Sequence, residues 1–212
     1  MPRLLLGLGS FILGGTTAAT LSVGNHAQAP VAVARPVQQT ALSPGRMTLA
    51  AASVRQALAE EQILRSVSTV LKVPQRMTYG EFRWDDRGVP AGPIWVRIDL
   101  KSQILSVFRG GHEIGTAVIL YGADGLATPT GKFPVLAKLK DHRSQTYDAP
   151  MPYTLRLTAD GVSIHGSNVR WGYATHGCVG VPTAFASKLF AAVSVGDDVL
   201  IVGGGPAKAA RA

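Results

Sequence analysis

The chain of 212 residues holds one cysteine, Cys178, so no disulfide bond can form within it. It also lacks any basic run. Residues 94–202 carry ten Lys or Arg and eight Asp or Glu, and the rest of the net charge of +8 is spread along the chain. Nucleic-acid-binding surfaces usually gather basic residues and interleave aromatic ones, so we expect no nucleic-acid partner. The mild basic excess suits work near an acidic polymer.

Long apolar runs are absent except at the N-terminus. Met1-Pro2-Arg3 precedes an apolar run over 4–13, and small residues follow up to Ala27-Gln28-Ala29. A positive start, an apolar core and an A-x-A site are typical of a secretory signal peptide over residues 1–29. Residues 4–23 carry no charge and are about long enough to span a bilayer, so an uncleaved anchor is the alternative. Both readings predict export to the periplasm or cell envelope.

Composition and periodicity divide the rest of the chain. Residues 30–50 are rich in Ala, Pro, Gln and Val without a period, which is typical of a linker. Apolar residues from Val54 to Leu71 recur near helical spacing and predict an amphipathic helix over 51–73. The main domain is expected over 94–202, followed by a disordered tail over 203–212.

Strand patterns dominate the main domain. Between Ile94 and Leu100, apolar residues alternate with other side chains, as in a half-buried strand. Short strands, glycine-rich turns and one late helix favour a mainly β fold, with a mixed sheet folded into a sandwich or barrel. Further strands are expected over 104–108, 112–120, 132–139, 153–157, 162–165 and 199–202, with a helix over 184–193.

His165 and Cys178 are the candidate catalytic pair. His165 ends a strand on the face opposite Ile164, and Cys178 follows thirteen residues later in a glycine-rich loop. A thiol becomes a strong nucleophile as a thiolate, and a nearby imidazole can take its proton and lower its pKa. His176 lies only two residues from Cys178, where local geometry tends to splay side chains apart, so His165 is the better base.

The backbone N–H groups of His176, Gly177 and Cys178 are oxyanion candidates, because a turn that feeds a helix N-terminus presents such donors. The same helix terminus would lower the thiol pKa further. Ser167 and Thr175 are candidates for polar support.

Two other readings of Cys178 remain. A single cysteine is often a small buried apolar residue. A metal site of His142, His165, His176 and Cys178 is disfavoured because no compact pair such as C-x-x-C occurs, and we expect no metal or cofactor.

Two motifs resemble the L,D-transpeptidase catalytic domain of bacterial cell-wall enzymes. One is Ile164-His165-Gly166 followed by Thr175-His176-Gly177-Cys178-Val179, and the other is the stretch from Thr128 to Val135, TPTGKFPV. The sequence Met151-Pro152-Tyr153 and the order of predicted strands match as well. The resemblance covers about half of the chain. It implies a β-sandwich of mixed sheets with the site in a cleft.

The resemblance implies that Cys178 is the nucleophile, that His165 donates and accepts the proton, and that Tyr153 lies at the substrate site. It implies two acyl-transfer steps on peptidoglycan stem peptides, through a thioester, without a cofactor. Water as the acceptor would make a carboxypeptidase or cysteine hydrolase, and a non-catalytic wall-binding module is the other alternative. Gly180 stands where the family usually has Arg or Asn, and the His165-to-Cys178 spacing is shorter than in many relatives.

Overall fold

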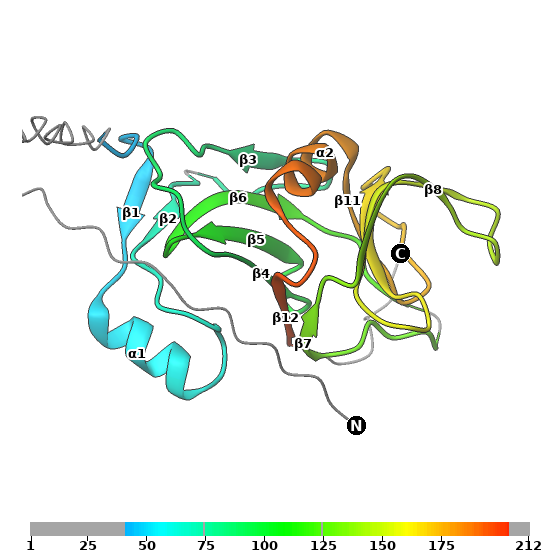
Figure 1. The fold of residues 1–212 in the computed structure, drawn as a ribbon, viewed down its shortest axis with the longest axis horizontal. Helices are drawn as coiled ribbons and strands as arrows, with labels where there is room; N and C mark the ends of the chain where they lie inside the picture. Colours follow the sequence, from blue (N-terminus) through cyan, green and yellow to red (C-terminus); the bar gives the residue numbers. More distant parts are fainter. Residues whose placement is uncertain (1–40, 74, 124, 204–212) are drawn as a thin grey trace, which may run out of the picture. The chain divides into compact units, whose positions relative to one another are not determined.

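Strands dominate the computed structural model, which describes residues 41–73, 75–123 and 125–203 (Figure 1). The predicted signal segment, residues 30–40 of the predicted linker and the tail beyond Gly203 lie outside the described residues. One sheet contains β1 (Arg46–Thr48), β2 (Thr69–Leu71), β3 (Phe82–Trp84), β4 (Ile94–Asp99), β5 (Ile104–Arg109), β6 (His112–Val118), β7 (Gly131–Pro134) and β12 (Asp198–Val202). The other contains β8 (Ala137–Arg143), β9 (Pro150–Arg156), β10 (Ser163–Ser167) and β11 (Val179–Pro182), and the helices are α1 (Ala51–Ala59) and α2 (Thr183–Ala192).

Both sheets are mixed, as predicted. The first runs in the order β1-β2-β6-β5-β4-β12-β7, with β3 also pairing with β6, and the second runs β11-β10-β9-β8. Parallel pairs are β2–β6, β4–β12 and β10–β11, and the other pairs are antiparallel. The mainly β architecture expected from the sequence is therefore confirmed.

One apolar core joins the two sheets. It contains side chains of the first sheet such as Val96 and Ile114, and side chains of the second such as Ile164 and Val179. Helix α2 lies between β3 and β11 (Figure 1) and contacts β9, β10 and β11. Its Phe185 is fully buried and packs edge-on against two aromatic rings of β3, with centroids 5.5 and 5.7 Å away. The burial of this interface holds the strands that carry the candidate site.

The N-terminal prediction was wrong over much of its length. Helix α1 begins at Ala51 as predicted but ends at Ala59 instead of 73. The apolar residues Val67 and Leu71 are buried by other means: Val67 packs with Trp95 and Phe108, and Leu71 belongs to β2. Edge pairing and burial therefore override the helical spacing in this segment. Part of the predicted linker likewise forms β1, which pairs with β2.

The strand predicted over 132–139 is in fact two strands in different sheets. Strand β7 pairs with β12 and ends at Pro134, which has no N–H to donate. The next two N–H groups bond across the change of sheet, Val135 to Asp197 O at 2.9 Å and Leu136 to Arg156 O at 2.7 Å. Strand β8 then pairs with β9. The short strands β3 and β11 were not predicted.

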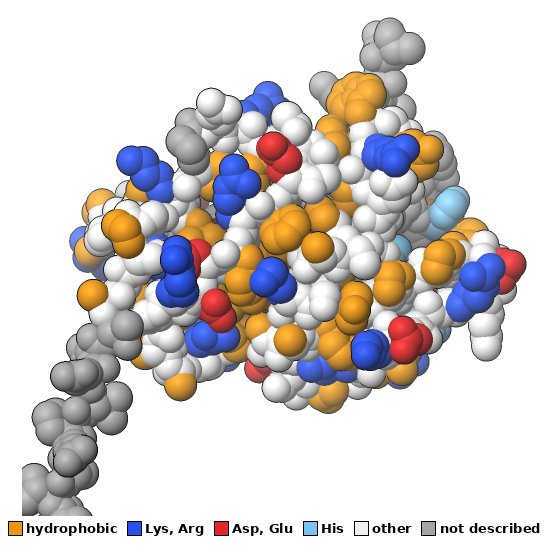
Figure 2. Space-filling model, turned by 90° about the horizontal axis from the view of Figure 1, so that it is seen from above, with side chains coloured by type: hydrophobic (Ala, Val, Ile, Leu, Met, Phe, Trp, Pro, Cys, Tyr) orange, Lys and Arg blue, Asp and Glu red, His pale blue; other side chains and the backbone are white. Residues whose placement is uncertain are grey.

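The surface carries scattered charge. Figure 2 shows Lys and Arg side chains interspersed with apolar and acidic ones on the face it presents. Within the described ranges, no helix has the length and apolar character needed to cross a membrane.

Candidate active site

The parallel pairing of β10 with β11 brings the two candidate catalytic residues together. Ile164 lies opposite Val179 and His165 opposite Gly180, so Cys178, just before β11, lies beside the start of β10. The thirteen residues between the pair in sequence become a loop that leaves and returns to the same sheet. His165 and Cys178 line one cleft of about 880 Å³. The structure thus places the two predicted residues in one cleft, and their catalytic roles stay a prediction.

His165 is buried and held in one orientation. Its Nδ1 lies 3.0 Å from the carbonyl oxygen of Gly166, and because a carbonyl only accepts, Nδ1–H is the donor. The neutral ring then carries its free lone pair on Nε2, the tautomer that can accept a proton. Burial lowers the pKa of His165; the bond to Gly166 opposes this shift, and the nearby His142 adds to it. The imidazole is therefore poised as a neutral base.

The Cys178 thiol is half-buried and opens onto the cleft, so it is not sealed in the core. Its Sγ donates to the carbonyl oxygen of Gly161, with Sγ and O 3.9 Å apart. Burial raises the pKa of the thiol; a hydrogen bond from the backbone of Ser163 lowers it, and the charge of Asp160 raises it. The expectation of a lowered thiol pKa in the resting protein was therefore wrong, because desolvation outweighs the favourable contacts.

The sequence also predicted that Cys178 would lie at the N-terminus of the late helix, and it does not. Strand β11 separates Cys178 from α2, which begins only at Thr183. With both pKa shifts directed toward the neutral forms, the resting cleft holds a neutral thiol and a neutral imidazole.

Two threonine hydroxyls position the nucleophile through its backbone. Thr175 Oγ1 donates to the carbonyl of Cys178, and Thr128 Oγ1 approaches the same carbonyl at 3.4 Å. Thr128 is buried and also accepts from the N–H of Gly122 at 2.9 Å. The motif that begins at Thr128 thus connects physically to the motif that ends at Cys178. Thr175 was a candidate for polar support, and its hydroxyl contacts the backbone carbonyl of Cys178.

A close backbone approach shapes the turn before Cys178. Gly177 has a φ of +97°, and a Cβ on Gly122 would lie 2.8 Å from the nitrogen of Gly177 and 2.0 Å from the oxygen of Leu126. Only glycine allows the two segments to pack this tightly. Among the described residues, no hydrogen bond engages the N–H of His176 or Gly177, so these donors remain candidates for an oxyanion site.

Of the remaining predicted site residues, two line the cleft and one does not. Ser167 and His176 line the cleft, and the exposed His176 ring stacks on Tyr147 with centroids 4.3 Å apart. Tyr153 does not line it; its ring packs edge-on against Phe190 of α2 at 5.8 Å. The sequence analysis missed Tyr147 in the β8–β9 loop, because no nearby residue indicates that its ring stacks on His176.

Gly180, which stands where the family usually has Arg or Asn, lies in a tightly packed position. A Cβ on Gly180 would lie 2.9 Å from Cβ of Ser167 and 3.4 Å from Cβ of Leu120. The backbone of Gly180 also exchanges two hydrogen bonds with Leu120, at 2.8 and 2.9 Å. A larger side chain here would force Ser167 aside, so the glycine and the serine form a matched pair at the cleft.

His142 lines the same cleft and influences His165 through its charge. Within the described residues, however, no group of three or more His, Cys, Asp or Glu side chains is arranged to hold a metal ion.

Comparison with known proteins matches this geometry to one family. Residues 93–201, slightly more than half of the chain, match the model of the L,D-transpeptidase catalytic domain. L,D-transpeptidase 1 of Mycobacterium tuberculosis strain H37Rv is 29% identical over 123 residues, which cover 49% of this chain and 48% of that protein. The chain thus spans about half the length of the curated relatives it matches.

The chain is also similar to solved structures of L,D-transpeptidases. An L,D-transpeptidase from Stackebrandtia nassauensis superposes with a TM-score of 0.50 and 26% identity over 55% of this chain and 58% of that one. A crystal structure of L,D-transpeptidase 1 from Mycobacterium tuberculosis has 25% identity and a TM-score of 0.46, over 52% and 61% of the two chains. With the cleft, the paired His165 and Cys178 and the family match all on one domain, the chain belongs to the L,D-transpeptidase catalytic domain family.

Proposed function

We propose that this protein is an L,D-transpeptidase that acts on peptidoglycan stem peptides through a thioester on Cys178. The observation that carries the proposal is the β10–β11 pairing, which sets an oriented neutral imidazole and a cleft-facing thiol in one cavity. A nucleophile next to a base that is itself held by a third group is the arrangement that covalent acyl transfer requires. The names of the relatives support the substrate class.

In the first step, the thiol proton passes to Nε2 of His165 as Sγ attacks the carbonyl of the third stem residue. The carbonyl oxygen gains the negative charge, and the N–H groups of Gly177 and Cys178 are the candidates to bind it. The terminal D-alanine leaves with the proton from His165, and the stem remains on Cys178 as a thioester. The fixed Nδ1–H bond to Gly166 keeps Nε2 available for both transfers.

In the second step, the side-chain amine of another stem attacks the thioester carbonyl. His165 takes a proton from the attacking nitrogen and returns it to the departing sulfur, which regenerates the starting thiol and imidazole. The product is a cross-linked pair of stems. Water in place of the amine would release a free tripeptide instead.

The test is product analysis of the purified chain with tetrapeptide stems by mass spectrometry. We expect cross-linked dimers with loss of one D-alanine, and a thioester adduct on Cys178 in the intact mass. Cys178→Ala is the matched control and should form neither. Tripeptide and D-alanine alone would identify a carboxypeptidase, and an unchanged stem with a well-folded protein would leave only a wall-binding module.

Export to the cell envelope is part of this proposal, because the substrate lies outside the cytoplasm. The apolar segment after Arg3 supports it. Intact-mass analysis of the protein from the envelope fraction distinguishes cleavage after Ala29 from a retained anchor, and recovery in the cytoplasm alone would contradict it.

A further inference from the structure

The charge of the cleft is opposite to the charge of the chain. The protein carries a net charge of +8, yet the residues that line the cleft include one carboxylate, Asp160, and no Lys or Arg. The other ionisable side chains of the lining are three histidines, Tyr147 and Cys178. Asp160 is therefore the one Asp, Glu, Lys or Arg side chain among the described residues that line the cleft.

Asp160 is exposed and available. It lies in the turn before β10, and none of the ion pairs or side-chain hydrogen bonds among the described residues involves it. The sequence alone explains Asp160-Gly161 as a hairpin turn, for which Asp-Gly is favoured. The fold adds a second role to that turn, because the carbonyl of Gly161 accepts from the Cys178 thiol. The turn that accepts from the Cys178 thiol therefore also places the Asp160 carboxylate in the cleft.

The position of this carboxylate has a cost for the chemistry. Its charge raises the pKa of the Cys178 thiol and so opposes formation of the thiolate. A bound cation would cancel that field and relieve the cost. A stem peptide with a side-chain amine brings such a cation to the same cleft.

We propose that Asp160 is a binding residue for the side-chain ammonium group of a peptidoglycan stem. This inference rests on the proposed function, since it names what the same cleft recognises. Asp160 selects stems that carry a free amine, and the bound ammonium removes the negative charge that works against the nucleophile. If the ammonium belongs to the stem that acylates Cys178, it also favours the thiolate. If it belongs to the stem that accepts the acyl group, it binds after Cys178 is acylated and gives one proton to solvent before its nitrogen attacks the thioester. The two sources predict different kinetics.

The first experiment compares Asp160→Asn with the wild-type protein. Asn-Gly is as good a hairpin turn as Asp-Gly, so the fold should be kept. Asp141→Asn is the matched control, because it removes the same charge from an exposed position on β8 that does not line the cleft. Acylation of Cys178 and transfer to an added amine stem are followed separately by mass spectrometry.

We expect Asp160→Asn to raise KM about two- to fivefold for the stem whose ammonium it binds, the loss expected of one charge interaction near the surface. If that stem is the donor, KM for acylation rises, and acetylating the donor's amine removes the difference between variant and wild type. If it is the acceptor, only KM of the transfer step rises. Unchanged KM values in both steps would overturn the inference, and no acyl-enzyme from the wild type would overturn the proposed function instead.

The second experiment needs no turnover. The rate at which iodoacetamide alkylates Cys178 is measured against pH, with and without N-acetyl-lysine amide as the amine probe. We expect Asp160→Asn to lower the pH midpoint of alkylation, and the probe to lower it in the wild type but not in the variant. A probe that shifts neither protein, or shifts both equally, would contradict binding at Asp160, even if transpeptidation itself is demonstrated.

Discussion

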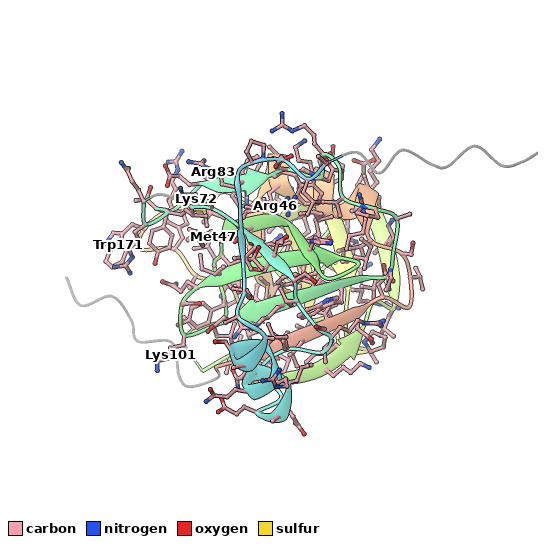
Figure 3. The ribbon with its side chains drawn as sticks, turned by 90° about the vertical axis from the view of Figure 1, so that its left-hand side faces the viewer. Arg46, Met47, Lys72, Arg83, Lys101 and Trp171 are labelled. Atoms are coloured by element: carbon pink, nitrogen blue, oxygen red, sulfur yellow. The ribbon has the colours of Figure 1, made fainter. Side chains whose placement is uncertain are left out.

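Residues 41–92 and residues 93–201 share one sheet but are held in it by different interactions. The later region supplies nearly all the buried residues of the main apolar core. The earlier one contributes Val89, packs Phe82 and Trp84 of β3 against that core, and places Val67 against Trp95 and Phe108 of the later region. Of its three short strands, β2 and β3 pair with β6, and β1 pairs with β2. Figure 3 looks onto them, with Arg46 and Met47 on β1 and Arg83 on β3. Apolar burial stabilises the later region, whereas the earlier region adds edge pairing and polar contacts to a smaller set of apolar contacts.

The polar contacts centre on Arg46. Its guanidinium donates to the backbone carbonyls of Glu113 in β6 and of Asp85, and the buried Glu113 carboxylate accepts from the N–H of Leu71 at 2.7 Å. Such bonds have directional requirements that apolar contacts lack, so they specify where the segment attaches. The segment also reaches the loop between His165 and Cys178, where Tyr79 packs edge-on against Trp171 at 5.6 Å (Figure 3).

The chemistry and the attachment are separable. Every residue that lines the cleft lies between Leu126 and Cys178, and none belongs to the earlier region. Changes in the cleft should therefore alter rate with little effect on the attachment of the segment, and changes around Arg46 should do the reverse.

The largest expected effect is on rate. His165→Ala removes the base and should lower the rate of acylation about 10²–10⁴-fold, because the thiol then has no positioned proton acceptor. Stopped assays of thioester formation measure the loss, and circular dichroism checks that the fold remains. His176→Ala is the control, since its exposed ring stacks on Tyr147. A larger loss of rate in His176→Ala than in His165→Ala would mean that His165 is not the base.

Next in size is an effect on stability alone. Arg46→Ala removes two charge-assisted bonds to partly buried carbonyls, and the free energy of unfolding should fall by about 1–3 kcal/mol. Denaturant titration gives this value, while kcat per folded molecule should stay unchanged. Arg55→Ala, at an exposed position of α1, should change stability by less than about 0.5 kcal/mol. Equal effects of the two substitutions would mean that the Arg46 contacts do not attach the segment.

A smaller effect on kcat is expected from the hydrogen bond between Thr175 and the backbone of Cys178. Thr175→Val removes the hydroxyl that holds the carbonyl of Cys178, which should lower kcat about fivefold at nearly constant KM, for a loss of about 1 kcal/mol. Thr146→Val changes a cleft residue that makes no side-chain hydrogen bond among the described residues and serves as the control. If KM rises and kcat does not fall, Thr175 contacts substrate rather than the nucleophile's peptide.

The smallest effect is a pH dependence of the attachment. Burial raises the pKa of Glu113, so the folded state favours its protonated form. Its contribution to stability is full below the unfolded pKa of about 4.3 and is lost as pH rises through the higher folded pKa. Unfolding of the wild type and of Glu113→Gln from pH 4 upward should show the wild type losing stability relative to the variant. Parallel curves would contradict this.

The sequence predicted β4 and β5 well, because apolar and polar residues alternate along them. Apolar residues alternate along 94–100 and 104–108, and the predicted bounds agree with β4 and β5 to within one residue. Trp95 and Phe108 are also buried, in the second apolar cluster, which the alternation did not predict. Strand β11 escaped prediction because it is four residues long and buried on both faces, which gives no alternation to detect. The helix over 51–73 was overextended, since Val67 and Leu71 owe their burial to partners distant in the chain.

The site shows the same division. Cys178 and His165 were identifiable because a lone cysteine in a glycine-rich loop, after a histidine at a strand end, suggests nucleophilic chemistry. Tyr153 was misplaced, because a short motif cannot tell which side of its strand packs on α2. The direction of the thiol pKa was also missed, since it depends on burial and on Asp160.

By itself, the sequence determined the residue types for the chemistry, the mainly β class and the family motifs, because local spacing and side-chain identity encode these directly. The tertiary structure alone decided that Cys178 lies beside β10, that Thr128 and Thr175 meet at its carbonyl, and that a turn carboxylate enters the cleft. Those outcomes depend on pairing and burial between segments far apart in the chain, where the partner and not the residue sets the environment.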